Sequence, residues 1–232
     1  MPMYFLLNAA NNPLSLEKWE ALFKDWRLFA EGLLTTLEIS VGALALAVVL
    51  GLLFGVMGTA KNSVFRGISR VYVEFFQNTP LLIQIFFVYN GLPLLGIVMS
   101  VPLIGILCVG IYHGAYISEV IRSGIQSIPR GQEEAALSQG FTATQTMREI
   151  ILPQAWRIVL PPFTNQVVSL IKNTSMVAII TGVDIMYVAN SWSGYNLYYA
   201  PAFIAAGALY FILCFPLTTL ASRMEIKNKE AY

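Results

Sequence analysis

Charged residues are scarce in this chain of 232 residues: Asp, Glu, Lys and Arg together make up 12% of it. Soluble globular domains carry about 25%. Hydrophobic residues make up 56%, so the composition excludes an ordinary soluble domain and indicates a membrane protein. The net charge of +1 also argues against a nucleic-acid-binding surface, which needs a strongly basic face.

Residues that usually carry metal or redox chemistry are nearly absent. The chain has one histidine, His113, and two cysteines, Cys108 and Cys214, all in apolar stretches. We expect the cysteines to be small buried hydrophobic side chains and His113 to be an interior side chain satisfied by hydrogen bonds. The chain has no Walker-type phosphate loop, so we expect it to hold no cofactor and to hydrolyse no ATP itself.

Apolar segments, by contrast, are long and frequent. A helix needs about 20 residues to cross the hydrocarbon core of a bilayer. Segments of about this length lie at residues 33–57, 71–95, 102–121, 158–183 and 200–221. They predict an all-α integral membrane protein with five transmembrane helices. Gly42, Gly51 and Gly55 on the first segment suit close packing against another helix.

The residues before the first segment, 1–27, form a leader of mixed composition. Leu16, Trp19, Leu22, Phe23 and Trp26 recur at helical spacing. This spacing predicts an amphipathic helix at the membrane interface, and a plain solvated leader is the alternative.

The distribution of Lys and Arg predicts the orientation of the chain. Ten of the 14 basic residues would lie on one side of the membrane. They are Lys61, Arg66, Arg70, Arg122, Arg130, Arg148, Arg157, Arg223, Lys227 and Lys229. The loops expected on the other side, near residues 96–100 and 184–199, have none. The positive-inside rule therefore predicts a cytoplasmic C-terminus and an external N-terminus. The three basic residues of the leader, Lys18, Lys24 and Arg27, argue against an external N-terminus.

The loop between the third and fourth segments contains a polar, ordered pattern. Glu133 and Glu134 suit the positive end of a helix dipole, and the alanines that follow are strong helix formers. Gly140 can adopt the left-handed conformation that ends many helices. The pattern predicts a short helix over residues 129–139, with Thr142 or Thr144 capping the next piece. Such a helix presents a flat surface to another protein.

This loop resembles the EAA motif of the membrane subunits of bacterial ABC importers. That motif is EAA, three residues, Gly, nine residues, Ile, any residue, Leu and Pro. The matching residues are Glu134, Ala135, Ala136, Gly140, Ile150, Leu152 and Pro153. The resemblance implies a type I importer whose loop, residues 125–157, holds a coupling helix that docks on a separate ATPase.

Further stretches resemble the polar amino-acid uptake subfamily, which is histidine/glutamine/glutamate permease-like. They are residues 76–84, 115–126 and 170–175. The resemblance implies a multi-pass permease of the bacterial plasma (inner) membrane, with a transmembrane domain at 28–223 and a cytoplasmic tail at 224–232. It implies two ABC ATPase subunits that bind ATP and Mg, a second permease copy or paralogue, and an extracytoplasmic amino-acid-binding protein.

Polar residues inside two of the apolar segments are candidates for the solute pathway. Pro80 predicts a break in the second segment, which either lines a cavity or only shapes packing. Lys172 in the fourth segment is costly at membrane depth, so it should face a solute cavity or pair with Glu74 or Glu119. The candidates are Gln77, Asn78, Thr79, Pro80, Gln84, Lys172, Asn173, Thr174 and Ser175.

Two departures from the family pattern bear on the identity of the solute. Members of the family often carry Arg where this chain has Gln77 and an acidic residue where it has Asn173. We hypothesise a neutral or acidic polar amino acid. The alternative functions are an ion-coupled secondary carrier, in which Glu38, Glu74 and Lys172 relay ions, and a membrane scaffold without transport. Neither alternative needs a capped docking helix.

Overall fold

The computed structural model describes residues 12–229, and all regular secondary structure in that range is helical. Three helices are long and apolar enough to cross a membrane: α2 (Trp26–Thr59), α5 (Val101–Gln126) and α10 (Tyr199–Lys229). They contain the first, third and fifth apolar segments of the sequence. The prediction of an all-helical chain with several membrane-spanning helices is therefore confirmed.

The other two apolar segments are bent. The second forms α3 (Ser63–Gln77) and α4 (Leu81–Gly91), with α4 continued by the 3-10 turn η3 (Leu92–Leu95), and the two parts meet at 94°. The fourth forms α8 (Leu152–Asn173) and the 3-10 helix η5 (Thr174–Ile180), which a bend of 45° separates from α9 (Ile185–Asn196). Counting each bent pair as one span gives up to five spans in the described residues.

Residues 184–199 are expected to form a loop, and that expectation is wrong. Most of them form α9, a helix of 12 residues that packs against α2 and α10. The Asp184 carboxylate caps this helix by accepting a hydrogen bond from the Tyr187 N–H at 3.0 Å. At its other end Trp192 Nε1 donates to Asp25 Oδ2 at 2.8 Å. The second contact joins residues far apart in the sequence, which local composition does not reveal.

Close packing of α2 on α5 forms the centre of the molecule. Gly51 and Gly55 of α2 are buried at this contact. A Cβ atom on Gly55 would lie 2.9 Å from Cβ of Ile121 and 2.9 Å from the Ser118 carbonyl oxygen. Gly42 meets Ile106 in the same way. The glycine face predicted for close helix packing is confirmed.

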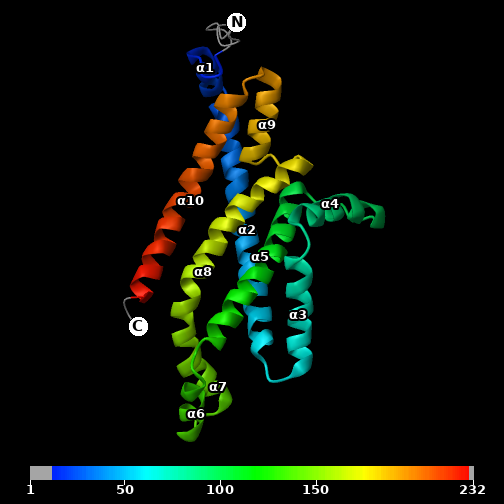
Figure 1. Ribbon diagram of the computed structural model, residues 1–232. Coiled ribbons are helices and arrows are strands. Elements are labelled where there is room, and N and C mark those ends of the chain that lie inside the picture. The colour runs from blue at the N-terminus through cyan, green and yellow to red at the C-terminus, as the bar shows by residue number, and fades with distance from the viewer. Residues whose placement is uncertain (1–11, 230–232) are drawn as a thin grey trace, which may run out of the picture.

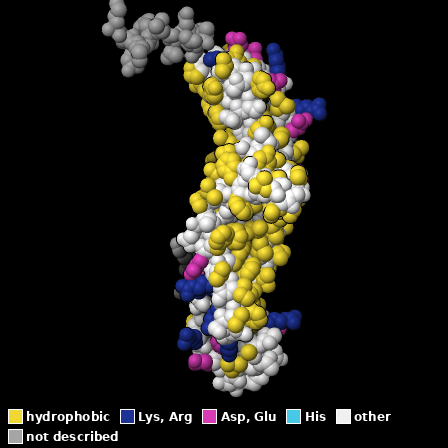
Figure 2. All heavy atoms as spheres, turned by 90° about the vertical axis from the view of Figure 1, so that its right-hand side faces the viewer, with side chains coloured by type: hydrophobic (Ala, Val, Ile, Leu, Met, Phe, Trp, Pro, Cys, Tyr) yellow, Lys and Arg dark blue, Asp and Glu magenta, His cyan; other side chains and the backbone are white. Residues whose placement is uncertain are grey.

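The molecule is elongated, with different elements at its two ends. Figure 1 shows α1 (Leu16–Lys24) and α9 at one end and α6 (Arg130–Ser138) and α7 (Ala143–Gln145) at the other. One apolar core surrounds α5, and a second joins α1, α2, α9 and α10. On the face in Figure 2, hydrophobic side chains cover the middle and charged side chains gather at the ends. This is the surface expected for a chain that spans a bilayer.

The leader predicted at 1–27 lies only partly within the described residues. Its amphipathic segment does form a helix, α1, in which Leu22 is buried. Residues 1–11 of the leader and 230–232 of the predicted tail lie outside the described range. The described part of the tail continues α10 as far as Lys229.

Candidate functional site

The short helix α6 lies in the loop between α5 and α8, and it ends where the sequence predicts. Gly140 adopts φ +87°, a left-handed conformation. Its N–H donates to the Leu137 carbonyl at 3.0 Å, and the Phe141 N–H donates to the Ala136 carbonyl at 3.1 Å. These two bonds form a Schellman motif, which satisfies the last carbonyls of the helix. The end of α6 is therefore structurally defined.

A second turn follows α6 and leads into α8. Thr142 caps α7 with a capping box: its Oγ1 accepts from the Gln145 N–H, and its own N–H donates to Gln145 Oε1 at 2.9 Å. The π-helical turn η4 (Thr146–Ile151) continues α7. Pro153 lies in the first turn of α8, directly after the π-helical turn. The chain from Thr142 to α8 is continuous helix.

The seven motif residues separate into an exposed group and a packed group. Glu134, Ala135 and Gly140 are exposed on α6 and its end, whereas Ala136 is buried. α6 packs against η4, where Ile150 is half-buried against the core around α5. Leu152 and Pro153 are exposed at the start of α8. The motif thus offers a polar surface at the end of the molecule on a base that is continuous with α8.

The predicted break in the second segment is present at Asn78–Pro80. Gln84 of α4 spans this corner: its Nε2 lies 2.8 Å from Thr79 Oγ1, 3.2 Å from the Thr79 carbonyl and 3.3 Å from the Phe76 carbonyl. Asn78 Nδ2 donates to the Glu74 carbonyl at 2.7 Å. Side chains of the predicted pathway residues thus bind the carbonyls that the break exposes, which supports a structural role for Asn78, Thr79 and Gln84.

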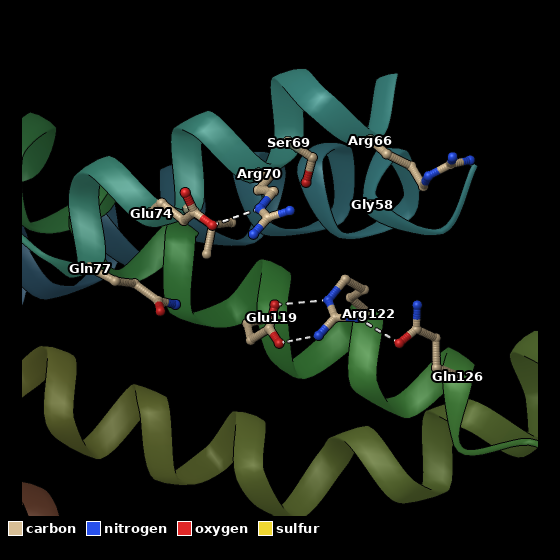
Figure 3. A pocket seen from close by; sticks show the side chains of 10 residues that line it. Gly58, Arg66, Ser69, Arg70, Glu74, Gln77, Glu119, Arg122 and Gln126 are labelled. Carbon is tan, nitrogen blue, oxygen red and sulfur yellow. Dashed lines mark hydrogen bonds and ion pairs between the residues drawn. The ribbon is translucent and has the colours of Figure 1, made fainter. Parts of the chain in front are cut away.

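Two adjoining cavities lie beside Gln77. One, of about 550 Å³, has Arg66, Arg70, Glu74, Glu119 and Arg122 in its lining (Figure 3). The other, of about 470 Å³, lies between α3, α5 and α8. Arg70 Nε contacts Glu74 Oε1 at 2.7 Å, and Arg122 pairs with Glu119. Gln77 reaches from α3 toward α5 and lines both cavities.

The predicted pathway residues at the end of α8, 172–175, do not form one site. Lys172 is exposed and lines a separate cavity of about 300 Å³ with Tyr210. The alternative of a Lys172 ion pair with Glu74 or Glu119 is wrong, since both carboxylates pair with arginines on their own helices. The rotation of α8 places Lys172 and Gln166 at different cavities.

The remaining residues of this cluster make local or interior contacts. Ser175 Oγ donates to the Lys172 carbonyl at 2.7 Å, and the buried Thr174 donates to the Ile171 carbonyl at 2.7 Å. Asn173 Nδ2 lies 3.0 Å from His113 Nε2. His113 is buried and bonded on both ring nitrogens, as expected for an interior histidine.

Gln166 of α8 is a cavity residue that the sequence did not single out. It lines the 470 Å³ cavity together with Gln77, and its Oε1 lies 3.3 Å from His113 Nδ1. Its only signal in the sequence is an amide inside an apolar segment that also contains Pro161 and Pro162.

Comparison with known proteins identifies the family. A family model described as "Binding-protein-dependent transport system inner membrane component" matches residues 47–227. The chain belongs to this family. The permease is 39% identical over 211 residues to a probable glutamine ABC transporter permease, GlnM, of Bacillus subtilis (strain 168), covering 91% of this chain and 98% of the relative. A second relative in that organism, a probable glutamine permease named GlnP, is 36% identical and covers 85% and 92%.

Solved structures agree with this assignment. A crystal structure of an amino acid ABC transporter with histidines matches the permease with a TM-score of 0.82 at 31% identity, covering 89% of this chain and 97% of that one. The MetNI methionine ABC transporter in an inward-facing conformation matches with a TM-score of 0.75 at 20% identity, a likeness of fold alone. The chain is an ABC importer permease of type I fold and a multi-pass membrane protein.

The ion-coupled carrier alternative is not favoured. Glu74 lines the 550 Å³ cavity beside Arg70, and Lys172 lines the separate 300 Å³ cavity. Glu38 is exposed on α2. A relay needs its groups close enough to exchange protons or ions, and these three groups do not converge on one cavity.

Proposed function

We propose that this permease moves a polar amino acid across the bacterial inner membrane, driven by two ABC ATPase subunits that bind ATP and Mg. The ATPase docks on α6, where Glu134, Ala135 and Gly140 form the contact surface and Ala136 holds the helix on η4. Ile150, Leu152 and Pro153 form the base of the loop. The observation that carries this proposal is the exposed α6 at one end of the molecule, with its defined Schellman end.

Transmission of movement follows from the connectivity. α6 packs on η4, and η4 continues into α8 without a break in the helix. α8 packs in turn on α5 and α10. A displacement of α6 by the ATPase is therefore passed to α8 as a rigid-body movement rather than absorbed in a flexible loop.

Five membrane crossings would put the ten basic residues named above on one side of the membrane and the two chain ends on opposite sides. We assign residues 28–223 to the transmembrane domain, with 125–157 as its cytoplasmic coupling loop. The N-terminus and the leader 1–27 then lie outside and the tail 224–232 lies in the cytoplasm. The cavities beside Gln77 are lined by one side of α3, α5 and α8, so a second permease, a copy or a paralogue, would complete the path.

An extracytoplasmic binding protein would deliver the solute. Two of the relatives are named as probable glutamine permeases, and one solved relative is an amino acid transporter. The amides near the cavities, with the carboxylates of Glu74 and Glu119 already paired with arginines, suit a neutral polar amino acid better than a cationic one.

The test is reconstitution of the permease with its ATPase, comparing wild type, Glu134→Lys and Gly140→Val. A β-branched residue is strained at φ +87°, and the reversed charge changes the exposed face of α6. We expect both variants to enter the membrane normally but to lose at least about tenfold in copurified ATPase, a loss of about 1.4 kcal/mol of binding free energy. ATP-dependent uptake should fall with it.

Two matched controls accompany the variants. Glu20→Lys makes the same charge change on α1, at the opposite end of the molecule. Gly131→Val adds the same side chain to α6 at a position where a Cβ meets nothing within 4 Å. Docking on α6 would be wrong if the controls and the variants bound the ATPase equally well.

A further inference from the structure

A buried histidine stands between two amides inside the permease. His113 of α5 is 2% exposed. Its Nε2 lies 3.0 Å from Asn173 Nδ2, and its Nδ1 lies 3.3 Å from Gln166 Oε1. Both amide side chains come from α8, so this cluster joins α5 to α8.

The hydrogen bonds determine which ring nitrogen carries the proton. An amide nitrogen only donates, so the Asn173 Nδ2 donates to His113 Nε2, which must be unprotonated. The neutral ring then carries its hydrogen on Nδ1, and Nδ1 donates to Gln166 Oε1. This arrangement holds the Gln166 amide in one orientation: its oxygen faces His113, and its nitrogen is left to donate elsewhere.

Gln77 is a second amide at the 470 Å³ cavity that Gln166 lines, and it offers an oxygen where Gln166 offers an N–H. Gln77 Nε2 donates one of its two N–H groups to the Ala115 carbonyl at 3.2 Å, which fixes the amide with Oε1 as an acceptor on its other side. Gln77 and Gln166 both line the 470 Å³ cavity. Glu119 also lines it, but its oxygens accept from Arg122. Among its neutral amides the cavity therefore offers an N–H donor from Gln166 and a carbonyl acceptor from Gln77, beside the hydroxyls of Tyr116, Ser123 and Ser127.

We propose that these two amides recognise a primary carboxamide, and that His113 is the residue that determines this specificity by positioning Gln166. The proposal rests on the proposed function. A carboxamide has one oxygen to accept from Gln166 and one NH₂ group to donate to Gln77. A carboxylate has no hydrogen for the Gln77 oxygen, and an ammonium has no acceptor for the Gln166 N–H. Either mismatch leaves a partly buried polar group unpaired.

The experiment measures solute binding directly, so that the selectivity of a separate binding protein does not enter. The permease with its ATPase is placed in nanodiscs without ATP, and binding of labelled L-glutamine is competed with L-glutamate and L-lysine. We expect wild type to prefer glutamine by at least about tenfold, the ratio that one unmatched hydrogen bond produces. Equal binding of glutamine and glutamate by wild type would overturn the proposal.

Variants at position 113 separate positioning from packing. Asn at 113 keeps an amide nitrogen near the place of Nδ1, so His113→Asn should retain most of the preference for glutamine. His113→Leu removes both hydrogen bonds and should reduce the preference to less than about threefold, because Gln166 can then turn its oxygen into the cavity. If the two variants change the affinity for all three solutes equally, His113 acts only in packing and the proposal is wrong.

A third variant keeps the test decisive if His113→Leu does not assemble. Gln166→Met preserves the length of the side chain and leaves the buried histidine in place, and it should abolish the preference in the same way. Retention of the preference in Gln166→Met would overturn the proposal. Failure of the proposed function is distinguishable, since wild type would then show no ATP-dependent uptake of any amino acid, whatever the variants do.

Discussion

Asp184 is a fully buried carboxylate that links α9 to α10. Its Oδ1 accepts from the Tyr187 N–H at the start of α9, and its Oδ2 accepts from the Tyr210 hydroxyl of α10 at 3.1 Å. Beside it, the Ile185 N–H donates to Thr36 Oγ1 of α2 at 3.1 Å. An acid without exposed surface is retained only where its oxygens are satisfied, so this corner should be sensitive to substitution.

We predict that Asp184→Ala lowers the free energy of unfolding by about 2 kcal/mol or more. The loss combines an N-cap, worth about 1 kcal/mol, with an unpaired buried hydroxyl, which costs about 1–3 kcal/mol. Thermal unfolding of the detergent-purified complex measures it. In a Tyr210→Phe background the same substitution should cost less, because no hydroxyl is left unpaired. Equal costs in the two backgrounds would show that Asp184 and Tyr210 do not act together.

At the scale of elements, the contact of α2 with α5 depends on the absence of side chains on α2. We predict that Gly55→Ala destabilises the permease, because the new Cβ would lie 2.9 Å from the Ser118 carbonyl and the Ile121 side chain. Gly67→Ala on α3 is the control: its Cβ meets nothing within 4 Å, so it should be neutral or stabilise by up to about 1 kcal/mol. The midpoint of thermal unfolding distinguishes them, and a harmless Gly55→Ala would contradict the packing.

The elements that could be predicted from the sequence are those with local causes. α6 ends at Gly140 because a glycine there permits positive φ, and the α3–α4 break follows from Pro80. α9 has a local N-cap at Asp184, but its packing depends on distant contacts. Its stability comes from the buried Asp184 and from Trp192, which bonds to Asp25 near the start of α2. Contacts between residues so far apart in sequence are not visible in composition or periodicity.

Among the candidate solute-pathway residues, too, some could be predicted from the sequence and others depend on how the helices pack. Gln77 could be singled out by its resemblance to a position where the family often carries Arg, and it lines both cavities. Gln166 was missed, and the proposed partners of Lys172 were wrong, because both depend on how α8 is rotated against α3 and α5. That rotation is set by side-chain packing over the length of α8, and a single sequence does not specify it.

The whole molecule combines a hydrophobic middle with charged ends (Figure 2). α6 is at one end, and the cavities beside Gln77 lie between α3 and α5 and between α3, α5 and α8. α8 connects the two, since it begins after η4 and carries Gln166 farther along. This is the arrangement that the proposed mechanism requires, in which an ATPase that binds α6 changes access to the cavities through α8.

The most direct test of this account is the energy source of transport. Proteoliposomes that contain the permease, its ATPase and the binding protein are loaded with ATP and Mg, and all ion gradients are collapsed with ionophores. We predict that amino-acid uptake continues under these conditions and stops when ATP is omitted. Uptake that persists without ATP, or that stops when the gradients are collapsed with ATP present, would contradict the ATP-driven mechanism and support an ion-coupled carrier.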